Sequence, residues 1–274
     1  MIKDLKNIVL DDNEYLLAEK GWGKKVVENT IVQKFLYDSE GNNVSGYVSL
    51  PKYIKNKLPV IIWNNGGDNK SGLLDDFLAK GILGEIASWN YAVFASQFKN
   101  VDGFKGSEVN NIINLISAIE SFDIINTSFI GMEGWSRGGM MSYMTLTKTD
   151  KIKCAVIIAG LADLLRNQDT INKNNLENFT KQVEPAYYYK LKKNSAVNFA
   201  DKISKNTSVL LIHGTADNKV AYQDSIDMYN KLKSYNIYGN YKLKLIEGGD
   251  HYLRNSRKEV SELRKNWYDS HLKL

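Results

Sequence analysis

Short apolar runs alternate with longer amphipathic stretches along most of the chain. Six runs rich in Val, Ile, Leu and aromatic residues have the length and composition of strands buried on both faces of a parallel sheet. Five longer segments repeat apolar residues at helical spacing. This alternation predicts an α/β fold with a mostly parallel, doubly wound sheet. The expected strands are 58–64, 91–96, 127–134, 153–160, 208–214 and 241–248, and the expected helices are 73–87, 107–122, 136–148, 224–235 and 257–272.

Two segments depart from this alternation. Residues 30–39 and 44–50 are strand-like and flank the turn-rich tetrapeptide EGNN, which predicts an antiparallel hairpin at the amino-terminal side of the sheet. Residues 161–205 form a long, polar, helix-like insertion between two expected strands, so we expect a small helical lid over the active groups. Since no repeat or linker interrupts the sequence, residues 1–274 should form a single domain.

Composition and charge narrow the class of protein. The formal net charge of +5 comes from Lys scattered among Asp and Glu, a pattern of solvated surface and not of a nucleic-acid-binding patch. Residues 1–20 lack the apolar core of a secretory signal, and the longest apolar runs are too short to span a membrane. The single cysteine, Cys154, excludes an internal disulfide and a multi-thiolate metal site, and its apolar surroundings indicate a core residue. We expect a soluble cytoplasmic protein whose oligomeric state the sequence does not indicate.

The clearest chemical signal lies in FIGMEGWSRGGMMSYMTL, residues 129–146. Gly134, Ser136 and Gly138 form G-x-S-x-G between an expected strand and an expected helix, which is the context of a nucleophile elbow. Glycines permit the sharp turn, and Gly139 extends the close contact between strand and helix. Ser136 would then project its hydroxyl above the sheet, although a bare G-x-S-x-G also occurs by chance in glycine-rich turns.

A serine nucleophile requires a histidine base, and the chain has three histidines. His271 is near the end of the last helix and is expected at the surface. His213 ends a strand, where its imidazole would support the following loop. His251 lies in a glycine-containing loop after the last strand, so we predict that His251 is the base.

A carboxylate must orient that base. Asp217 follows the strand 208–214 and gives the chain order Ser, Asp, His, which is the order of α/β-hydrolases. Asp250 is adjacent to His251 in sequence, but neighbouring side chains in an extended loop point apart, so Asp250 is expected to shape the loop. Asp163 follows the strand after the nucleophile and is the second choice. The predicted triad is therefore Ser136, Asp217 and His251.

Three motifs, GWSRGG, LLIHGTADNKV and EGGDH, together resemble the catalytic domain of the prolyl oligopeptidase family of serine peptidases. The resemblance begins near LPVIIWNNGG and extends to the carboxyl terminus. It implies an α/β-hydrolase fold with Ser136, Asp217 and His251 at the family's nucleophile, acid and base positions. Two features depart from the family. Its members usually carry an amino-terminal β-propeller, for which the residues before position 58 are too few, and WNNGGD stands where many relatives have His-Gly-Gly-Pro or an oxyanion-binding tyrosine.

Two backbone donors are expected at the oxyanion. The N–H of Arg137 would point from the start of the helix toward the developing charge. Similarity to His-Gly-Gly loops indicates Gly67 as the second donor, with Asn65 and Gly66 shaping its loop. The alternative is that Gly66 and Gly67 only form a tight turn.

Aromatic side chains near the motifs are candidates for the substrate pocket. We predict that Trp135 and Tyr188 bind substrate. Tyr187, Tyr188 and Tyr189 either line the pocket or pack the lid onto the domain, and Phe98 and Phe104 either border the cleft or pack within their loop.

These residues predict a serine hydrolase that cleaves an amide or ester through an acyl-enzyme, with no metal and no organic cofactor. The family resemblance favours a peptidase acting on small peptides. A carboxylesterase acting on small esters is the alternative, because both reactions pass through the same intermediates. A non-catalytic binding protein with the same fold is a second alternative. No nucleic-acid or membrane partner is expected.

Overall fold

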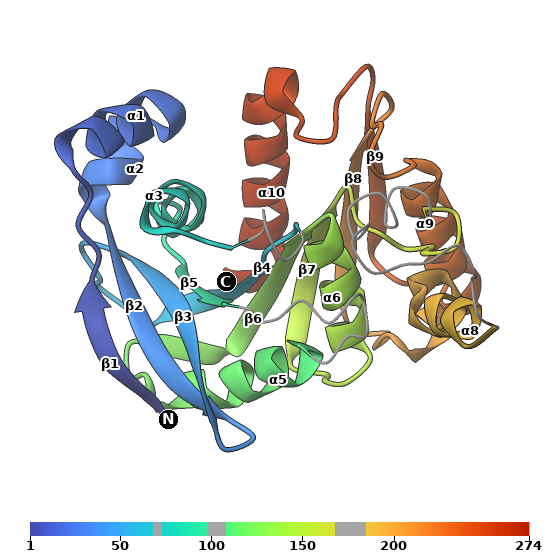
Figure 1. Cartoon of the computed structure of the whole chain (residues 1–274), viewed down its shortest axis with the longest axis horizontal. Coiled ribbons are helices and arrows are strands. Elements are labelled where there is room, and N and C mark those ends of the chain that lie inside the picture. Colours follow the sequence, from blue (N-terminus) through green and yellow to red (C-terminus); the bar gives the residue numbers. More distant parts are fainter. Residues whose placement is uncertain (68–72, 98–107, 168–184, 274) are drawn as a thin grey trace.

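A nine-stranded mixed sheet forms the centre of the protein (Figure 1). The structure, a computed structural model, describes residues 1–67, 73–97, 108–167 and 185–273. In the order β1-β2-β3-β5-β4-β6-β7-β8-β9, the first four strands pair antiparallel and those from β5 onward pair parallel. This arrangement confirms the predicted α/β fold with its antiparallel hairpin. The strands are β1 (Ile2–Asn7), β2 (Thr30–Ser39), β3 (Asn42–Pro51), β4 (Leu58–Asn64), β5 (Ala92–Ser96), β6 (Ile125–Trp135), β7 (Ile152–Ile158), β8 (Ser208–Gly214) and β9 (Tyr241–Ile246).

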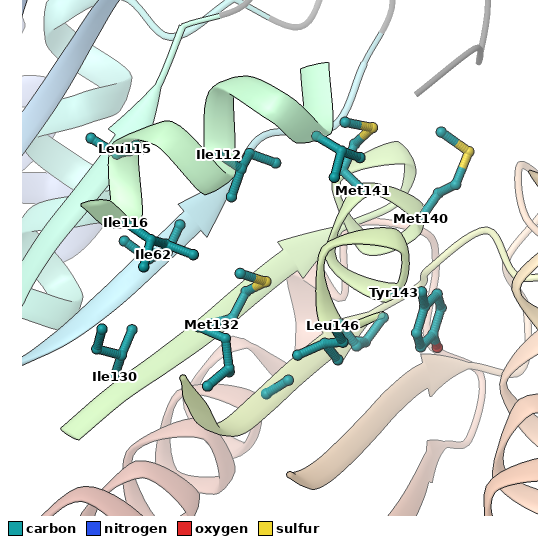
Figure 2. Packing of buried hydrophobic residues seen from close by; sticks show 14 of the residues in the cluster. Ile62, Ile112, Leu115, Ile116, Ile130, Met132, Met140, Met141, Tyr143 and Leu146 are labelled. Atoms are coloured by element: carbon teal, nitrogen blue, oxygen red, sulfur yellow. The ribbon is translucent and has the colours of Figure 1, made fainter. Parts of the chain in front are cut away.

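Helices cover both faces of this sheet, so apolar side chains from both faces are buried. On one face, Met141 and Leu146 of α6 belong to the same buried cluster as Ile112 of α5 and Ile130 and Met132 of β6, and Figure 2 shows Met141 beside Ile112. This face carries α5 (Glu108–Ala118), α6 (Arg137–Leu146) and α9 (Gln223–Tyr235). The opposite face carries α10 (Arg257–Leu272) and a continuous helical segment made of α3 (Asp76–Leu78), the π-helical turn η1 (Ala79–Leu83) and α4 (Gly84–Ala87).

The amino-terminal elements were not predicted from the sequence. β1 is an edge strand in which every side chain after the first is exposed, so it lacks the alternation that marks a half-buried strand. Two helices follow, α1 (Asp12–Trp22) and α2 (Lys24–Asn29). Asp11 and Glu14 form a capping box at the start of α1, each side chain accepting from the other's backbone N–H, and this signal was present in the sequence.

The described part of the insertion 161–205 lies beside α6 and α9 (Figure 1). It contains α8 (Pro185–Asn194) and the short 3-10 turns Ala196–Asn198 and Ala200–Lys202. Residues 168–184 of the expected lid lie outside the described residues. The lid therefore stays a prediction for that part, while the described helix packs at the flank of the sheet.

The order of the strands creates the site. After β4 the chain forms β5 on one side of it and then β6 on the other side, so the order reverses between neighbouring strands. Ligand sites in open α/β sheets lie at such switch points, beyond the carboxyl ends of the strands. The register places Asn64, at the end of β4, beside Gly134 of β6. The NNGG loop and the GWSRGG turn are therefore neighbours.

Candidate active site

Ser136 occupies a strained turn between β6 and α6. Its φ of 57° and ψ of −120° are a conformation that residues other than glycine rarely adopt. Backbone hydrogen bonds hold the turn, because the N–H of Ser136 donates to Ile158 O at 2.9 Å and its carbonyl accepts from Gly139 N at 2.9 Å and Leu161 N at 3.2 Å. This is the geometry expected of a nucleophile elbow.

The glycines around Ser136 are required by close backbone approaches. A Cβ on Gly134 would overlap the carbonyl of Gly138, and a Cβ on Gly138 would overlap the carbonyl of Asn64. A Cβ on Gly139 would lie 2.6 Å from the Cα of Gly160. Only Gly134 serves the predicted contact between strand and helix, whereas Gly138 lets α6 approach the end of β4 and Gly139 lets it approach the loop after β7.

The structure brings Asp217 and His251 together. Asp217 Oδ2 lies 2.7 Å from His251 Nδ1, and both side chains are buried. Because Nδ1 faces a carboxylate, it carries the imidazole proton, which leaves Nε2 as the acceptor. His251 and Ser136 line the same cavity, of about 630 Å³.

Asp217 is held by several donors at once. The N–H groups of Lys219 and Val220 donate to Oδ1 at 2.8 and 2.9 Å, and His213 Nε2 lies 3.1 Å from Oδ2. Burial would raise the pKa of the Asp217 carboxyl, but hydrogen bonds from His213, His251 and Val220 hold that pKa well below its ordinary value. The carboxylate is therefore ionised at neutral pH.

His213 supports the acid, in keeping with its predicted role in the loop after β8. Its Nε2 faces two acceptors, Asp217 Oδ2 and Val220 O, each at 3.1 Å, so Nε2 carries a proton. Its Nδ1 lies 2.7 Å from the hydroxyl of Ser225, which can donate to it. The sequence did not reveal that His213 and His251 share one oxygen of Asp217.

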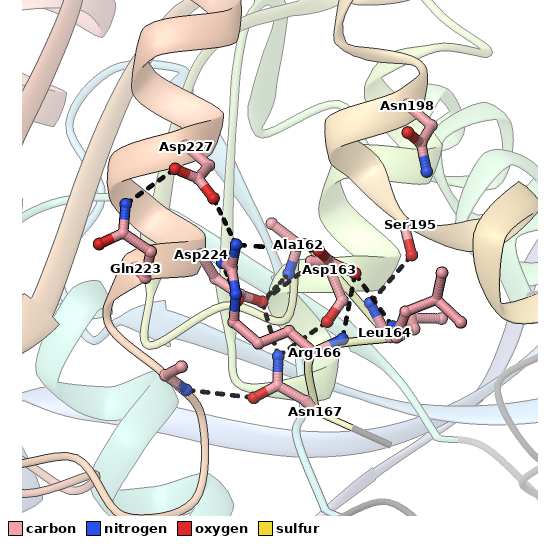
Figure 3. Close-up of polar contacts among 12 residues, drawn as sticks. Ala162, Asp163, Leu164, Arg166, Asn167, Ser195, Asn198, Gln223, Asp224 and Asp227 are labelled. Atoms are coloured by element: carbon pink, nitrogen blue, oxygen red, sulfur yellow. Dashed lines mark hydrogen bonds and ion pairs between the residues drawn. The ribbon is translucent and has the colours of Figure 1, made fainter.

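The rival acid Asp163 belongs to another polar cluster, shown in Figure 3. Its Oδ1 accepts from the N–H groups of Leu165 and Arg166, and its own N–H donates to Asp224 Oδ2 at 2.8 Å. Asp224 is fully buried on α9 and also pairs with Arg166 at 2.9 Å. Burial raises the pKa of Asp224 despite these partners. The cluster fastens the loop after β7 to α9.

The structure also places two other candidates, Asp250 and His271. Asp250 accepts from the N–H of Arg254 at 3.1 Å and so shapes the loop that carries His251. His271 is in the last turn of α10 and contacts Asn240 at 2.7 Å. Its ring is half-buried against Trp267, so His271 is less exposed than the sequence predicted.

The loop after β4 lies against the serine turn. A Cβ on Gly66 would come within 2.7 Å of the carbonyl of Trp135 and 3.2 Å of the Ser136 Cβ. Gly67 has a φ of 88°, which strongly favours glycine. Asn65, Gly66, Gly67 and Arg137 all line the cavity. The two predicted oxyanion donors are thus close to Ser136.

Arg137 is anchored by its side chain. The guanidinium is 2% exposed and forms a buried ion pair with Glu108, at the start of α5. Because Arg137 opens α6, this pair fixes the first helical turn after the serine. The sequence shows an acidic residue at the start of an apolar helix, but its burial against Arg137 is visible only in the structure.

Of the predicted pocket residues whose side chains the structure describes, only Trp135 lines the cavity. Its indole N–H also donates to the carbonyl of His251 at 3.1 Å, so the ring links the nucleophile turn to the base loop. Tyr188 is 50% exposed on α8 and is not among the residues that line the cavity. Within the described part of the insertion, Leu161 alone lines it. Phe98 and Phe104 lie outside the described residues, as does the side chain of Tyr187.

A buried ionic network forms the floor of the cavity. Arg264 of α10 donates to both carboxylate oxygens of Glu133 at 2.8 and 2.9 Å, and also to Glu85 at 2.9 Å. Tyr268 and Trp63 complete the coordination of Glu133 at 2.6 and 3.2 Å. Glu133 directly precedes Gly134, so the network fixes β6 next to the serine turn.

Metal-binding groups and membrane-spanning helices would each bear on the function. Across residues 1–67, 73–97, 108–167 and 185–273, no group of three His, Cys, Asp or Glu side chains is arranged to hold a metal ion. None of the helices in those ranges is long and apolar enough to cross a membrane. Cys154 is buried in β7, and burial raises the pKa of its thiol above its usual value.

Curated proteins similar in sequence are fungal aminopeptidases. A probable dipeptidyl-aminopeptidase B of Paracoccidioides brasiliensis is 26% identical over 228 residues, covering 77% of this chain and 24% of that protein. The corresponding protein of Sclerotinia sclerotiorum is 26% identical over 230 residues, covering 78% and 24%. The chain thus spans about a quarter of the length of these relatives.

Solved structures share the fold. The acylaminoacyl peptidase of Pyrococcus horikoshii matches with a TM-score of 0.75 and 19% identity, covering 91% of this chain and 43% of that one. A putative dienelactone hydrolase from Klebsiella pneumoniae matches with a TM-score of 0.63 and 14% identity, covering 88% and 99%. A family model described as the prolyl oligopeptidase family matches residues 97–274, more than half of the chain. The chain therefore belongs to the prolyl oligopeptidase family.

Proposed function

We propose that this protein is a serine peptidase that cleaves small peptides through an acyl-enzyme. The observation that carries the proposal is the 2.7 Å contact between Asp217 Oδ2 and His251 Nδ1 in the cavity that Ser136 also lines. It supplies an oriented base beside a hydroxyl held on a strained turn. Family membership favours an amide as the substrate bond.

In the proposed mechanism, His251 Nε2 accepts the Ser136 proton as the hydroxyl attacks the scissile carbonyl. Asp217 keeps the imidazole in the required tautomer and balances its charge once it is protonated. The backbone N–H groups of Arg137 and Gly67 stabilise the oxyanion. His251 then protonates the leaving amine, and water hydrolyses the acyl-enzyme by the same steps in reverse.

A carboxylesterase acting on small esters is the second candidate. The observation that favours it is the structural match to a putative dienelactone hydrolase of Klebsiella pneumoniae. The match covers nearly the whole length of that protein. Ester and amide hydrolysis share the acyl-enzyme and differ in how strongly the leaving group needs a proton. Hydrolysis of p-nitrophenyl esters compared with aminoacyl and prolyl amides would separate the two candidates.

The hydrolase assignment is tested by covalent labelling with a fluorophosphonate probe. We expect the wild-type protein to be labelled and Ser136→Ala to remain unlabelled, whereas Ser142→Ala should be labelled normally. Ser142 is a suitable control because it lies buried on the same helix and bonds Asn64 and Gly138. If well-folded wild-type protein were not labelled, the proposal would fail and the non-catalytic alternative would be favoured.

A further inference from the structure

Positive charge accumulates at the mouth of the cavity. Arg264, at its floor, is neutralised by Glu85 and Glu133, and Arg137 pairs with Glu108. The remaining charged residues of the described lining, apart from His251, are all cationic. They are Lys219, Arg254 and Arg257.

Aromatic rings hold each of these three cations. Lys219 Nζ donates to the hydroxyl of Tyr252 at 2.6 Å and lies 4.8 Å from the centre of its ring. The guanidinium of Arg254 lies 4.6 Å from the same ring, and that of Arg257 lies 4.9 Å from the ring of Trp22. Asp250, 3.4 Å from Arg254, offsets part of the charge but does not line the cavity. Contact with aromatic faces restricts the side chains and preorganises the charges.

The cations lie on the side of the base. Tyr252 and Arg254 follow His251 in the same loop, Arg257 begins α10 directly after that loop, and Lys219 follows Asp217 by two positions. In acyl transfer the histidine gives its proton to the leaving group, so the leaving group must lie beside it. The cations therefore line the cavity on the side where the leaving group is expected.

We propose that the site selects substrates whose leaving group carries a carboxylate, namely short peptides cut close to a free carboxyl terminus. The inference rests on the proposed peptidase function. The Ser136 Oγ–carbon bond forms first and His251 takes the serine proton. When the tetrahedral intermediate collapses, the scissile carbon–nitrogen bond breaks and the leaving nitrogen takes that proton from His251. The released amino acid or short peptide carries away the new amino group and its original carboxylate. Trp22, Trp63 and Leu78 supply apolar wall for the substrate's side chains.

The test compares one peptide with a free terminal carboxylate and the same peptide with a terminal amide. We expect kcat/KM to be about tenfold higher for the free acid at low ionic strength, since each exposed ion pair contributes up to roughly fivefold. The preference should shrink as salt is added, because screening weakens exposed pairs. In the double variant Arg254→Gln/Arg257→Gln only Lys219 remains, so the ratio should fall to about fivefold or less.

Lys258→Gln is the matched control, because Lys258 is adjacent to Arg257 in α10 but does not line the cavity. It should keep the wild-type ratio, which separates contact with the substrate from a change in net charge. An amidated peptide with an aspartate at its last position distinguishes a side-chain carboxylate from the terminal one. If the amidated peptide ending in aspartate were cleaved faster than the peptide with a free terminal carboxylate, the terminal-carboxylate assignment would be overturned.

Failure of this inference is distinct from failure of the proposed function. If fluorophosphonate labels Ser136 and an uncharged ester is hydrolysed, but acid and amide peptides are cleaved equally, the carboxylate site is refuted and the hydrolase remains. If the double variant keeps the wild-type ratio, Arg254 and Arg257 do not select the substrate and the proposal fails. Absence of labelling would refute the catalytic proposal itself.

Discussion

His213 Nε2 lies 3.1 Å from Asp217 Oδ2, the same oxygen that His251 Nδ1 approaches to 2.7 Å. Two imidazoles therefore meet at one carboxylate oxygen, one fully buried behind it and one facing the cavity. His213 itself is fixed by Ser225 and by the carbonyl of Val220. This arrangement determines where Asp217 points, so we assign His213 as a positioning residue.

Replacing His213 tests that assignment. His213→Phe keeps a ring but removes the hydrogen bond to a charged group, so we expect kcat to fall by about tenfold to a hundredfold with KM little changed. His213→Gln retains a donor at nearly the same distance from the backbone and should recover most of the activity. Equal kcat values for wild type and His213→Phe on a p-nitrophenyl ester would contradict the role. His271→Gln is the control, because His271 is in the last turn of α10 and does not line the cavity.

The choice of acid is tested by two conservative amides. Asp217→Asn should lower kcat by about ten-thousandfold, since an amide can stabilise the wrong tautomer of His251 and cannot balance its charge. Asp163→Asn should reduce kcat far less, because Asp163 caps a turn at Leu165 and Arg166. Steady-state kinetics of the two folded variants decides between them. If Asp163→Asn lost most of its activity while Asp217→Asn stayed active, Asp163 and not Asp217 would be the acid of the triad.

The loop after β4 is tested at Gly67, whose φ is 88°. A β-branched residue is strained in this conformation, so Gly67→Val should displace the backbone N–H and lower kcat by roughly tenfold or more. Gly21→Ala is the control, because Gly21 lies in α1 with no atom within 4 Å of an added Cβ. It should leave kcat unchanged and stabilise the protein by up to about 1 kcal/mol. Normal kinetics in folded Gly67→Val would place the second donor elsewhere.

The sequence was most informative where one residue type is required by local geometry. Gly134, Gly138 and Ser136 could be interpreted because a strand-turn-helix elbow tolerates few alternatives. The position of Asp217 relative to His251 followed from chain order in a known topology. These signals are local or follow directly from the order of the strands.

Contacts between distant segments could not be read in this way. The hydrogen bond from Trp135 to the carbonyl of His251 joins residues 116 positions apart, and no pattern marks it. Tyr188 was predicted in the pocket because it lies in the insertion expected to cover the active groups as a lid, yet the described part of the insertion packs at the flank of the sheet. The place of the insertion depends on its packing against α9, and the spacing of apolar residues in the sequence does not indicate that contact. The exposed strand β1 lacked a signal for the same reason, since its register depends on pairing with β2.

The network at the cavity floor should contribute strongly to stability. Arg264→Met leaves Glu133 and Glu85 without their cation, and breaking a buried pair costs about 3–5 kcal/mol. Urea unfolding monitored by circular dichroism would measure the change in the free energy of unfolding. Lys151→Met, which removes an exposed pair with Glu120, should cost less than about 1 kcal/mol. Similar values for the two variants would mean that the buried network contributes little.

Finally, Asp217 should make stability depend on pH in a defined direction. Hydrogen bonds from His213, His251 and Val220 outweigh the effect of burial and depress the pKa of the folded carboxyl. In the unfolded chain an aspartate titrates near its ordinary value of about 3.9. At pH values above that, the depressed pKa contributes its full stabilisation. As pH falls through the range between the unfolded and folded values, the unfolded state binds a proton first and the contribution is lost.

Asp217→Asn has no such proton to bind. At pH 7 it should unfold more easily than wild type, because it lacks the charged acceptor of both histidines. The difference between the two free energies of unfolding should then narrow as the pH is lowered below about 4, since only wild type loses the contribution of the carboxylate. Urea titrations at a series of pH values from 7 downward measure this difference directly. A gap that stays constant, or widens, toward acid would show that the depressed pKa of Asp217 does not contribute to the stability of the fold.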